Sequence, residues 1–211
     1  MRIRLLPPAV LLPAACAALL AVAGCASTPA DRFHTLMASE LAPRSAAARA
    51  PIAIVLEPIR LLASVDQPQW LVRLPDDSVA LLEQERWASP LRDEFRQALL
   101  EVLVVRHAAV DARTLPSGRG ALRVGVDLRR FESVPSREAR IEGSWTIVAS
   151  GPTAPVLHCE IVIREAAAGG PPTVAAAHRR ALARLADAIG VALGAIADGQ
   201  RAGCPTSDPR G

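Results

Sequence analysis

Histidine and cysteine are the residue types in this sequence that could act as nucleophiles, general bases or metal ligands. The four histidines lie far apart and show no spacing typical of a metal site. They are His34, His107, His158 and His178. The sequence contains neither a Gly-x-Ser-x-Gly turn nor a phosphate-binding Gly-Lys-Ser/Thr run. We therefore expect a protein that is not an enzyme, with no catalytic residue, no metal site and no cofactor.

The chain begins with a segment typical of a secretory signal peptide. Arg2 and Arg4 give it a charged start, residues 5–23 are uncharged and mostly apolar, and small residues precede Cys25. The alternative is an uncleaved transmembrane helix, because the apolar stretch is nearly long enough to span a bilayer. Proline breaks helix continuity and disfavours that alternative. The prolines within the stretch are Pro7, Pro8 and Pro13.

The run Val22-Ala23-Gly24-Cys25 resembles the lipobox of bacterial lipoproteins. The resemblance implies that residues 1–24 are removed and that the Cys25 thiol carries fatty acids such as palmitate. Several acyl chains on one cysteine would hold the protein firmly on a membrane. Ala26 follows, instead of the aspartate associated with inner-membrane retention in enteric bacteria, so the resemblance implies the periplasmic face of the outer membrane.

After processing, Cys159 and Cys204 remain as a pair in an oxidising compartment. A disulfide between them is one hypothesis, and it would contribute roughly 4 kcal/mol by the chain-entropy account. The alternative is a buried Cys159 in a strand and a free thiol at Cys204 in an irregular tail.

Removal of residues 1–24 from the 211 leaves 187, which suits one domain with a substantial core. It also takes away Arg2 and Arg4, so the formal charge of +3 falls to +1. Basic residues are scattered and aromatic residues are scarce, which speaks against nucleic acid as a partner. Composition predicts a flexible tether over 25–50, a domain over 51–199 and a C-terminal tail over 200–211.

The first half of the domain reads as strands followed by a helix. Residues 52–56 are a short apolar run typical of a buried strand, and the runs 70–74 and 78–82 flank a turn and predict a hairpin. Ser89 suits the N-cap of a helix that begins with Pro90. The apolar stripe of this helix comprises Leu91, Phe95, Leu99 and Val102.

The second half shows strict alternation of apolar and polar residues, which predicts three antiparallel strands around residues 122–129, 141–147 and 157–163. A last helix is expected over 173–198, ending at Gly199. We place His178 on its surface and His158 on the solvent face of a strand. The whole pattern predicts an α+β fold: a two-layer sandwich of a mainly antiparallel sheet covered by two helices.

The segment from Asp66 to Leu91 carries two of the three tryptophans beside arginines and prolines. Trp and Arg favour protein interfaces, so the segment is a candidate partner-binding site. Its candidate residues are Asp66, Gln67, Trp70, Arg73 and Trp87. The alternative is structural: Trp87 would fasten the start of the helix to the core, and Trp70 would cover a sheet edge. If Trp70 meets a partner, its replacement by Ala should leave thermal stability nearly intact.

The same residues resemble the auxiliary lipoproteins of ABC-type transport systems, the PqiC/YmbA-like family. Members carry an Asp-Arg-Pro-Gln-Ile-Val-x-Arg segment and then Trp-Ala-Glu-Pro-Leu, which correspond to residues 66–73 and 87–91 here. Further similar positions are Val124, Val126, Phe131-Glu132, Trp145, Ala177-His178, Ala181-Leu182-Ala183 and Leu185. Gln67 replaces the family's usual arginine and Trp70 an aliphatic residue, which implies a different or weaker partner contact if that arginine binds one.

The resemblance implies a non-catalytic subunit that docks a periplasmic lipid-transport conduit to the outer membrane and supports membrane integrity. Its implied partner is a Mce-domain protein, with a permease and an ATPase as separate chains, and a homo-oligomer is plausible by analogy. Two other functions remain open: a structural or assembly lipoprotein for an outer-membrane β-barrel or a surface polymer, and an envelope hydrolase without a recognisable motif.

Overall fold

The folded domain is the second of two compact units into which the chain divides, Met1–Ala30 and Asp31–Gly211. The computed structural model describes residues 29–42, 50–115, 120–149 and 156–204. The predicted signal peptide, Cys25 and part of the predicted tether lie outside these residues. Among the described residues, no helix is both long and apolar enough to cross a membrane.

Two long helices and a large mixed sheet make up the domain, which confirms the α+β class. The strands are β1 Arg32–His34, β2 Ile52–Leu56, β3 Arg60–Leu61, β4 Gln69–Arg73, β5 Val79–Trp87, β6 Ala109–Asp111, β7 Leu122–Val134, β8 Glu138–Val148 and β9 Val156–Ala166. The helices are α2 Leu91–His107, the 3-10 turn η2 Ala112–Thr114 and α3 Pro171–Ala197.

The sheet is less antiparallel than the sequence indicated. The predicted hairpin β4–β5 and the meander β7–β8–β9 are antiparallel, as expected. However, β2, β3 and β4 all pair with β7 in parallel, and β1 adds to β5 in parallel. Parallel pairing joins strands that are distant in sequence, and alternation within a strand does not reveal it.

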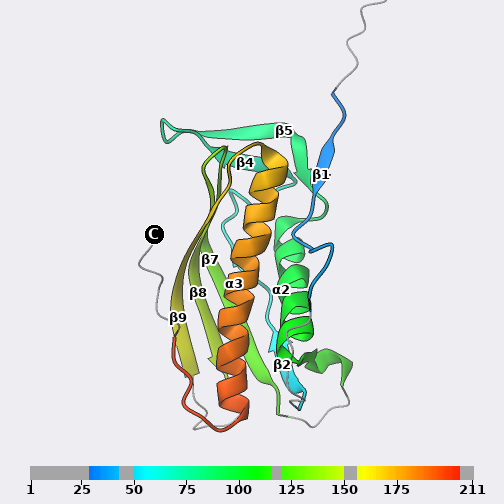
Figure 1. Cartoon of the computed structure of the whole chain (residues 1–211), viewed down its shortest axis with the longest axis vertical. Helices are drawn as coiled ribbons and strands as arrows, with labels where there is room; N and C mark the ends of the chain where they lie inside the picture. Colours follow the sequence, from blue (N-terminus) through cyan, green and yellow to red (C-terminus); the bar gives the residue numbers. More distant parts are fainter. Residues whose placement is uncertain (1–28, 43–49, 116–119, 150–155, 205–211) are drawn as a thin grey trace, which may run out of the picture. The chain divides into compact units, whose positions relative to one another are not determined.

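Helices α2 and α3 lie side by side against the curled sheet (Figure 1). The predicted stripe of α2 is buried, with Phe95 and Leu99 fully inaccessible. On α3, Leu182, Leu185, Ile189 and Leu193 are buried in the same core. Burial of these stripes is what fixes the two helices to the sheet, because helices in proteins draw most of their stability from tertiary packing.

The two helices approach each other closely at Gly190. A Cβ atom built at this position would lie only 2.1 Å from Cγ of His107 at the end of α2. The His107 ring fills this space, and its Nε2 lies 2.8 Å from Oδ1 of Asp187 on α3. Gly190 therefore allows the imidazole to sit against the backbone of α3.

The start of α2 differs from the prediction. Pro90 occupies the N-cap position and no side chain caps the helix. Ser89, the predicted N-cap, instead donates its hydroxyl to Oε1 of Glu94 at 3.2 Å. Glu94 is only 5% exposed, and it also accepts hydrogen bonds from a second segment of the chain.

That segment is part of the predicted tether, and the interpretation as a flexible tether is wrong for residues 31–42. The backbone N–H of Leu36 and the hydroxyl of Thr35 donate to Oε2 of Glu94 at 2.9 and 2.8 Å. Arg179 on α3 donates to the carbonyl oxygen of Thr35 at 2.9 Å. Leu36 is 2% exposed. The domain therefore begins at Asp31 and not at Pro51, because polar contacts and one buried leucine hold a segment of low apolar content.

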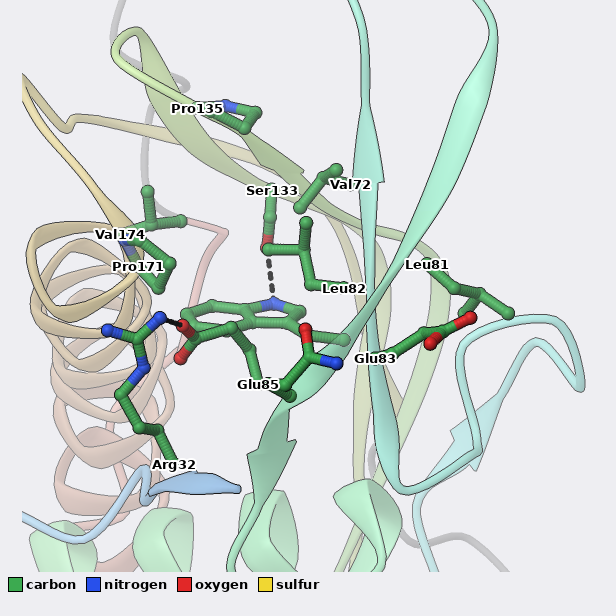
Figure 2. Close-up of a pocket in the computed structure, with 12 residues that line it drawn as sticks. Arg32, Val72, Leu81, Leu82, Glu83, Glu85, Ser133, Pro135, Pro171 and Val174 are labelled. Carbon is green, nitrogen blue, oxygen red and sulfur yellow. Dashed lines mark hydrogen bonds and ion pairs between the residues drawn. The ribbon is translucent and has the colours of Figure 1, made fainter. Parts of the chain in front are cut away.

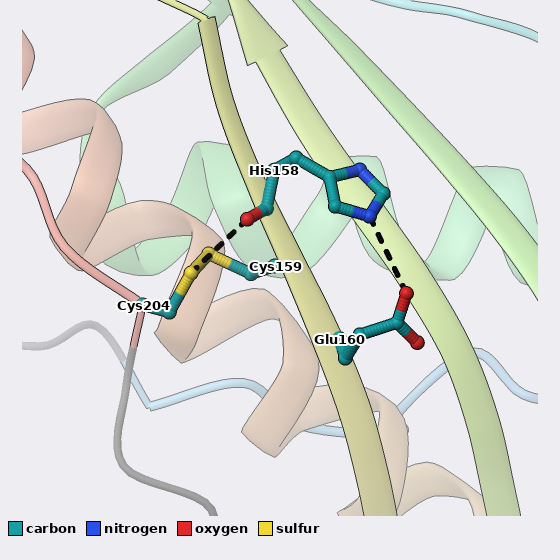
Figure 3. The surroundings of a disulfide bond; sticks show 4 residues. All are labelled: His158, Cys159, Glu160 and Cys204. Atoms are coloured by element: carbon teal, nitrogen blue, oxygen red, sulfur yellow. Dashed lines mark hydrogen bonds and ion pairs between the residues drawn. A yellow bond between two sulfur atoms is a disulfide. The ribbon is translucent and has the colours of Figure 1, made fainter.

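At the other end of the chain, Cys159 and Cys204 form a disulfide (Figure 3). Cys159 on β9 is buried, and the bond fastens the start of the tail to the sheet. Sγ of Cys204 also lies 3.2 Å from the carbonyl oxygen of His158. This is a contact without a proton, since a disulfide sulfur carries none. The imidazole of His158 is exposed, as expected.

Candidate functional site

Both tryptophans of the candidate segment lie in one aromatic cluster between the sheet and α3. Trp70 and Trp87 are 2% and 3% exposed, and their ring centroids are 4.7 Å apart. His34 packs on the outer side of Trp70 at 4.8 Å. On the inner side, Trp87 meets Phe131 and His178 edge-on at 6.0 and 6.1 Å. The cluster thus runs from the first strand of the domain into its core.

A buried chain of hydrogen bonds crosses this cluster. The indole Nε1–H of Trp70 donates to Oγ of Ser133 at 2.7 Å, and the same oxygen lies 2.9 Å from Nε2 of His178. Because Oγ accepts from the indole, the Ser133 hydroxyl proton is available for Nε2. The imidazole proton then resides on Nδ1, which has no hydrogen-bond partner among the described residues.

A serine beside a histidine invites comparison with a nucleophile–base pair, and the surroundings argue against that function. Ser133 is 1% exposed and its oxygen already accepts a hydrogen bond. Burial lowers the pKa of His178 to about 3, so the imidazole is a weak base. Within the part of the chain that the structure describes, no carboxylate orients the imidazole through Nδ1, as a catalytic triad requires. The pair therefore stabilises the core and keeps His178 neutral.

A cavity of about 580 Å³ lies beside the cluster, between β5, the β7–β8 turn and the start of α3 (Figure 2). Its apolar wall includes Trp70, Leu82 and Val174. At its edge Glu85 accepts from Arg32 and contacts His34, each at 2.5 Å. Glu85 is 4% exposed, so both of its oxygens are committed within the domain.

The polar residues of the candidate site each have a partner within the domain. Asp66 accepts from Arg92 at 2.6 Å, and Gln67 donates its amide to the carbonyl oxygen of Ser64 at 2.9 Å. Arg73 donates to Oε1 of Glu132 at 2.6 Å. These contacts give Asp66, Gln67 and Arg73 structural roles, and partner binding by any of them stays a prediction.

The Arg73–Glu132 contact also determines the charge of both groups. The hydrogen bond that Arg73 donates to Glu132 raises the pKa of Arg73. Burial acts to raise the pKa of Glu132, but the hydrogen bond from Arg73 and the charge of Arg130 outweigh it and lower that pKa. Both groups therefore stay ionised at neutral pH.

For the two tryptophans, burial favours the structural alternative. The expectation that Trp70→Ala would leave stability nearly intact is wrong, because the indole packs between two other rings and its N–H has a buried acceptor. Truncation of a buried tryptophan costs about 3–5 kcal/mol. Trp87 lies next to the start of α2, as the structural alternative required.

Sequence reasoning missed Ser133 and His178. The expectation that His178 lies on the surface is wrong, because it is 0% exposed. Its spacing could have revealed this, since Val174, His178 and Leu182 recur every four residues and continue the apolar stripe of α3. Among the described residues, no group of three or more His, Cys, Asp or Glu side chains could hold a metal ion.

Comparison with solved structures shows the same fold in other proteins. Protein XCC0632 from Xanthomonas campestris matches with a TM-score of 0.59 and 19% identity, over 80% of this chain and 97% of its own. An uncharacterized protein matches with a TM-score of 0.61 and 15% identity, over 77% of this chain and 97% of its own. No protein of curated function matches the chain.

A family model gives the decisive match. It is described as an ABC-type transport auxiliary lipoprotein component and matches residues 34–190, from the end of β1 through most of α3. That range contains Trp70, Trp87, Ser133 and His178, so the whole aromatic cluster lies within it. The chain therefore belongs to the family of ABC-type transport auxiliary lipoprotein components.

Proposed function

We propose that this protein is a non-catalytic, lipid-anchored subunit of an ABC-type transport system of the Mce kind. In this proposal Cys25 is acylated and holds the domain on the periplasmic face of the outer membrane. The domain then docks the end of a periplasmic conduit, formed by a Mce-domain protein, to that membrane. A permease and an ATPase are separate chains, and the transport of lipids supports membrane integrity.

The observation that carries the proposal is the family match over residues 34–190. The buried chemistry of the domain supports a docking role over a catalytic one. In the described core, Ser133 and His178 form a buried serine–histidine pair. Burial lowers the pKa of this imidazole to about 3. Glu85 and Glu94, the two buried carboxylates, are both occupied by contacts that hold the N-terminal segment.

The short connection between Cys25 and the domain also supports the proposal. Arg32, where β1 begins, follows Cys25 by seven positions. A chain of that length spans at most about 25 Å. An acylated Cys25 would therefore keep the domain close to the bilayer and raise its local concentration around other membrane components.

Membrane fractionation tests the anchor. A Cys25→Ser variant, secreted behind a cleavable signal peptide without a lipobox, should be found in the soluble periplasmic fraction. The native protein should sediment with the outer membrane and incorporate labelled palmitate. Equal membrane association of the two proteins would contradict the anchor.

Co-purification of the native protein with a Mce-domain protein supports the docking function, whereas co-purification with a β-barrel alone would favour the assembly function.

A further inference from the structure

Exposed apolar side chains gather at the end of the domain where the described chain begins. Among the described residues, eight large hydrophobic side chains are exposed, and four of them lie on β1 and on the β4–β5 hairpin. They are Phe33 at 64%, Val79 at 56%, Leu81 at 49% and Leu74 at 36%. The other four are spread over the loop after β3, α2, β9 and α3. We call the four residues on β1 and the hairpin the apolar edge.

The hairpin exposes Val79 and Leu81 to solvent. Leu81 pairs with Leu71 and Val79 with Arg73, so Val79 and Leu81 lie on one face of the hairpin. The opposite face carries Trp70 and Leu82, and both of these residues and Leu81 at the strand edge line the cavity described above. Figure 1 shows that the hairpin crosses the ends of the two helices, with its turn on the side away from β1 and the end of β5 beside β1. Solvent-exposed apolar residues on a projecting hairpin have no partner in the described domain to explain them.

The length of the chain between Cys25 and Phe33 limits how far the apolar edge can lie from a membrane anchor at Cys25. Phe33 follows Cys25 by eight residues, a span of at most about 29 Å. Arg32, Leu81, Pro171 and Val174 line one cavity, so β1, the hairpin and the start of α3 share one end of the domain. Val191 on α3 lies about 30 Å further along the helix axis from Pro171. An anchor at Cys25 therefore keeps Phe33 within about 29 Å of the bilayer and allows Val191 to lie further away.

We propose that the apolar edge inserts into the phospholipid surface to which Cys25 is anchored. This inference rests on the proposed function, because it requires acylation of Cys25. It assigns the hairpin β4–β5 as a second membrane contact that fixes the orientation of the domain. Acidic Asp76, Asp77 and Glu83 accompany basic Arg32 at this end, so charge attraction to the lipid headgroups is not what holds it. The contact is apolar and should persist when the salt concentration is raised.

Environment-sensitive labels on single introduced cysteines test this contact. The lipidated protein, with its disulfide kept oxidised, carries the label at Val79→Cys or Leu81→Cys and is reconstituted in vesicles of phosphatidylethanolamine and phosphatidylglycerol. Val191→Cys is the matched control, because Val191 is at least as exposed as Val79 and Leu81, at 65%, but lies on α3. We expect a blue-shifted emission and quenching by spin-labelled phospholipid at positions 79 and 81, several-fold stronger than at 191, at low and at high salt.

Each other outcome would overturn the inference in a distinct way. Equal quenching at positions 79, 81 and 191, in protein whose Cys25 is acylated by mass spectrometry, would refute the second contact and leave the proposed function standing. A blue shift at 79 and 81 that requires an added periplasmic protein would assign the apolar edge to a protein partner instead. Absence of acylation on Cys25 would contradict both the inference and the proposed anchor.

Discussion

Trp70 and Ser133 are 63 residues apart in the sequence and are joined by a buried hydrogen bond of 2.7 Å between the indole N–H and the hydroxyl oxygen. The bond fastens the hairpin strand β4 to β7, with which β4 shares only one paired position, Val72 with Ser133. It also brings the hydroxyl of Ser133 to His178 on α3. One serine therefore connects the hairpin, the central strand and the last helix.

Ser133→Ala should destabilise the domain by about 1–3 kcal/mol, because it leaves the indole N–H of Trp70 buried without an acceptor. Urea denaturation followed by tryptophan fluorescence measures the loss. Trp70→Phe in the Ser133→Ala background should cost less than in the native background, since the two groups satisfy each other. Ser39→Ala, at an exposed serine, is the control and should change little. Equal losses for Ser39→Ala and Ser133→Ala would contradict the structural role of the hydrogen bond.

The stability of the domain should fall as the pH is lowered, through His178. Burial lowers its pKa to about 3 in the folded state, whereas the unfolded imidazole has a pKa near 6.5. Between these values only the unfolded chain takes up the proton, so His178 reduces stability by about 1.4 kcal/mol per pH unit below pH 6.5. The full stability is present above that pH.

Denaturation series at pH 7, 6 and 5 measure this dependence. His178→Gln should be less stable than the native protein at pH 7 but should lose less stability between pH 6 and pH 5. His158→Gln, at an exposed position, should keep the native slope. If His178→Gln and His158→Gln showed the same slope, the buried neutral imidazole would not be the cause.

Reduction of the Cys159–Cys204 bond should lower stability by about 4 kcal/mol, because the bond closes a loop of 45 residues that contains all of α3. Melting curves with and without a reducing agent measure the change. A Cys204→Ser variant should melt at the temperature of the reduced native protein and should not respond to the reducing agent. Two free thiols in the non-reduced secreted protein, found by mass spectrometry, would show that the bond does not form.

Gly190→Ala should separate the two helices at their closest point. The added methyl group would overlap the His107 ring, which is held by Asp187 at 2.8 Å. We expect a loss of about 1–3 kcal/mol from overpacking. Val191→Ala, the next residue along the helix, is exposed and should be nearly neutral. A neutral Gly190→Ala would mean that His107 moves away without cost.

Periodic patterns made much of the fold predictable. The stripe from Leu91 to Val102 gave α2, and the alternation over 122–129 gave the central strand β7. The order of parallel strands was not predictable, because their pairing depends on contacts between distant residues such as Val72 and Ser133. The packing of residues 31–42 was also missed, because it depends on the buried carboxylates of Glu85 and Glu94, which the sequence pattern does not reveal.

The candidate site was predictable only in part. Trp70 and Trp87 were recognised as unusual, but composition alone could not distinguish an interface from a core, and both are buried. Their polar partners Ser133 and His178 are common residue types without a motif, and the fold brings them together from β7 and α3. By contrast, the disulfide hypothesis needed only the count of cysteines left after processing and agrees with the Cys159–Cys204 bond in the structure.

The measurement that tests the proposed function most directly is affinity purification of the lipidated, C-terminally tagged protein from cross-linked envelopes, with mass spectrometry of the proteins recovered. We predict recovery of a Mce-domain protein together with its permease, and much less of both with the soluble Cys25→Ser form. Recovery of a β-barrel alone, or of no transport component, would contradict the docking function.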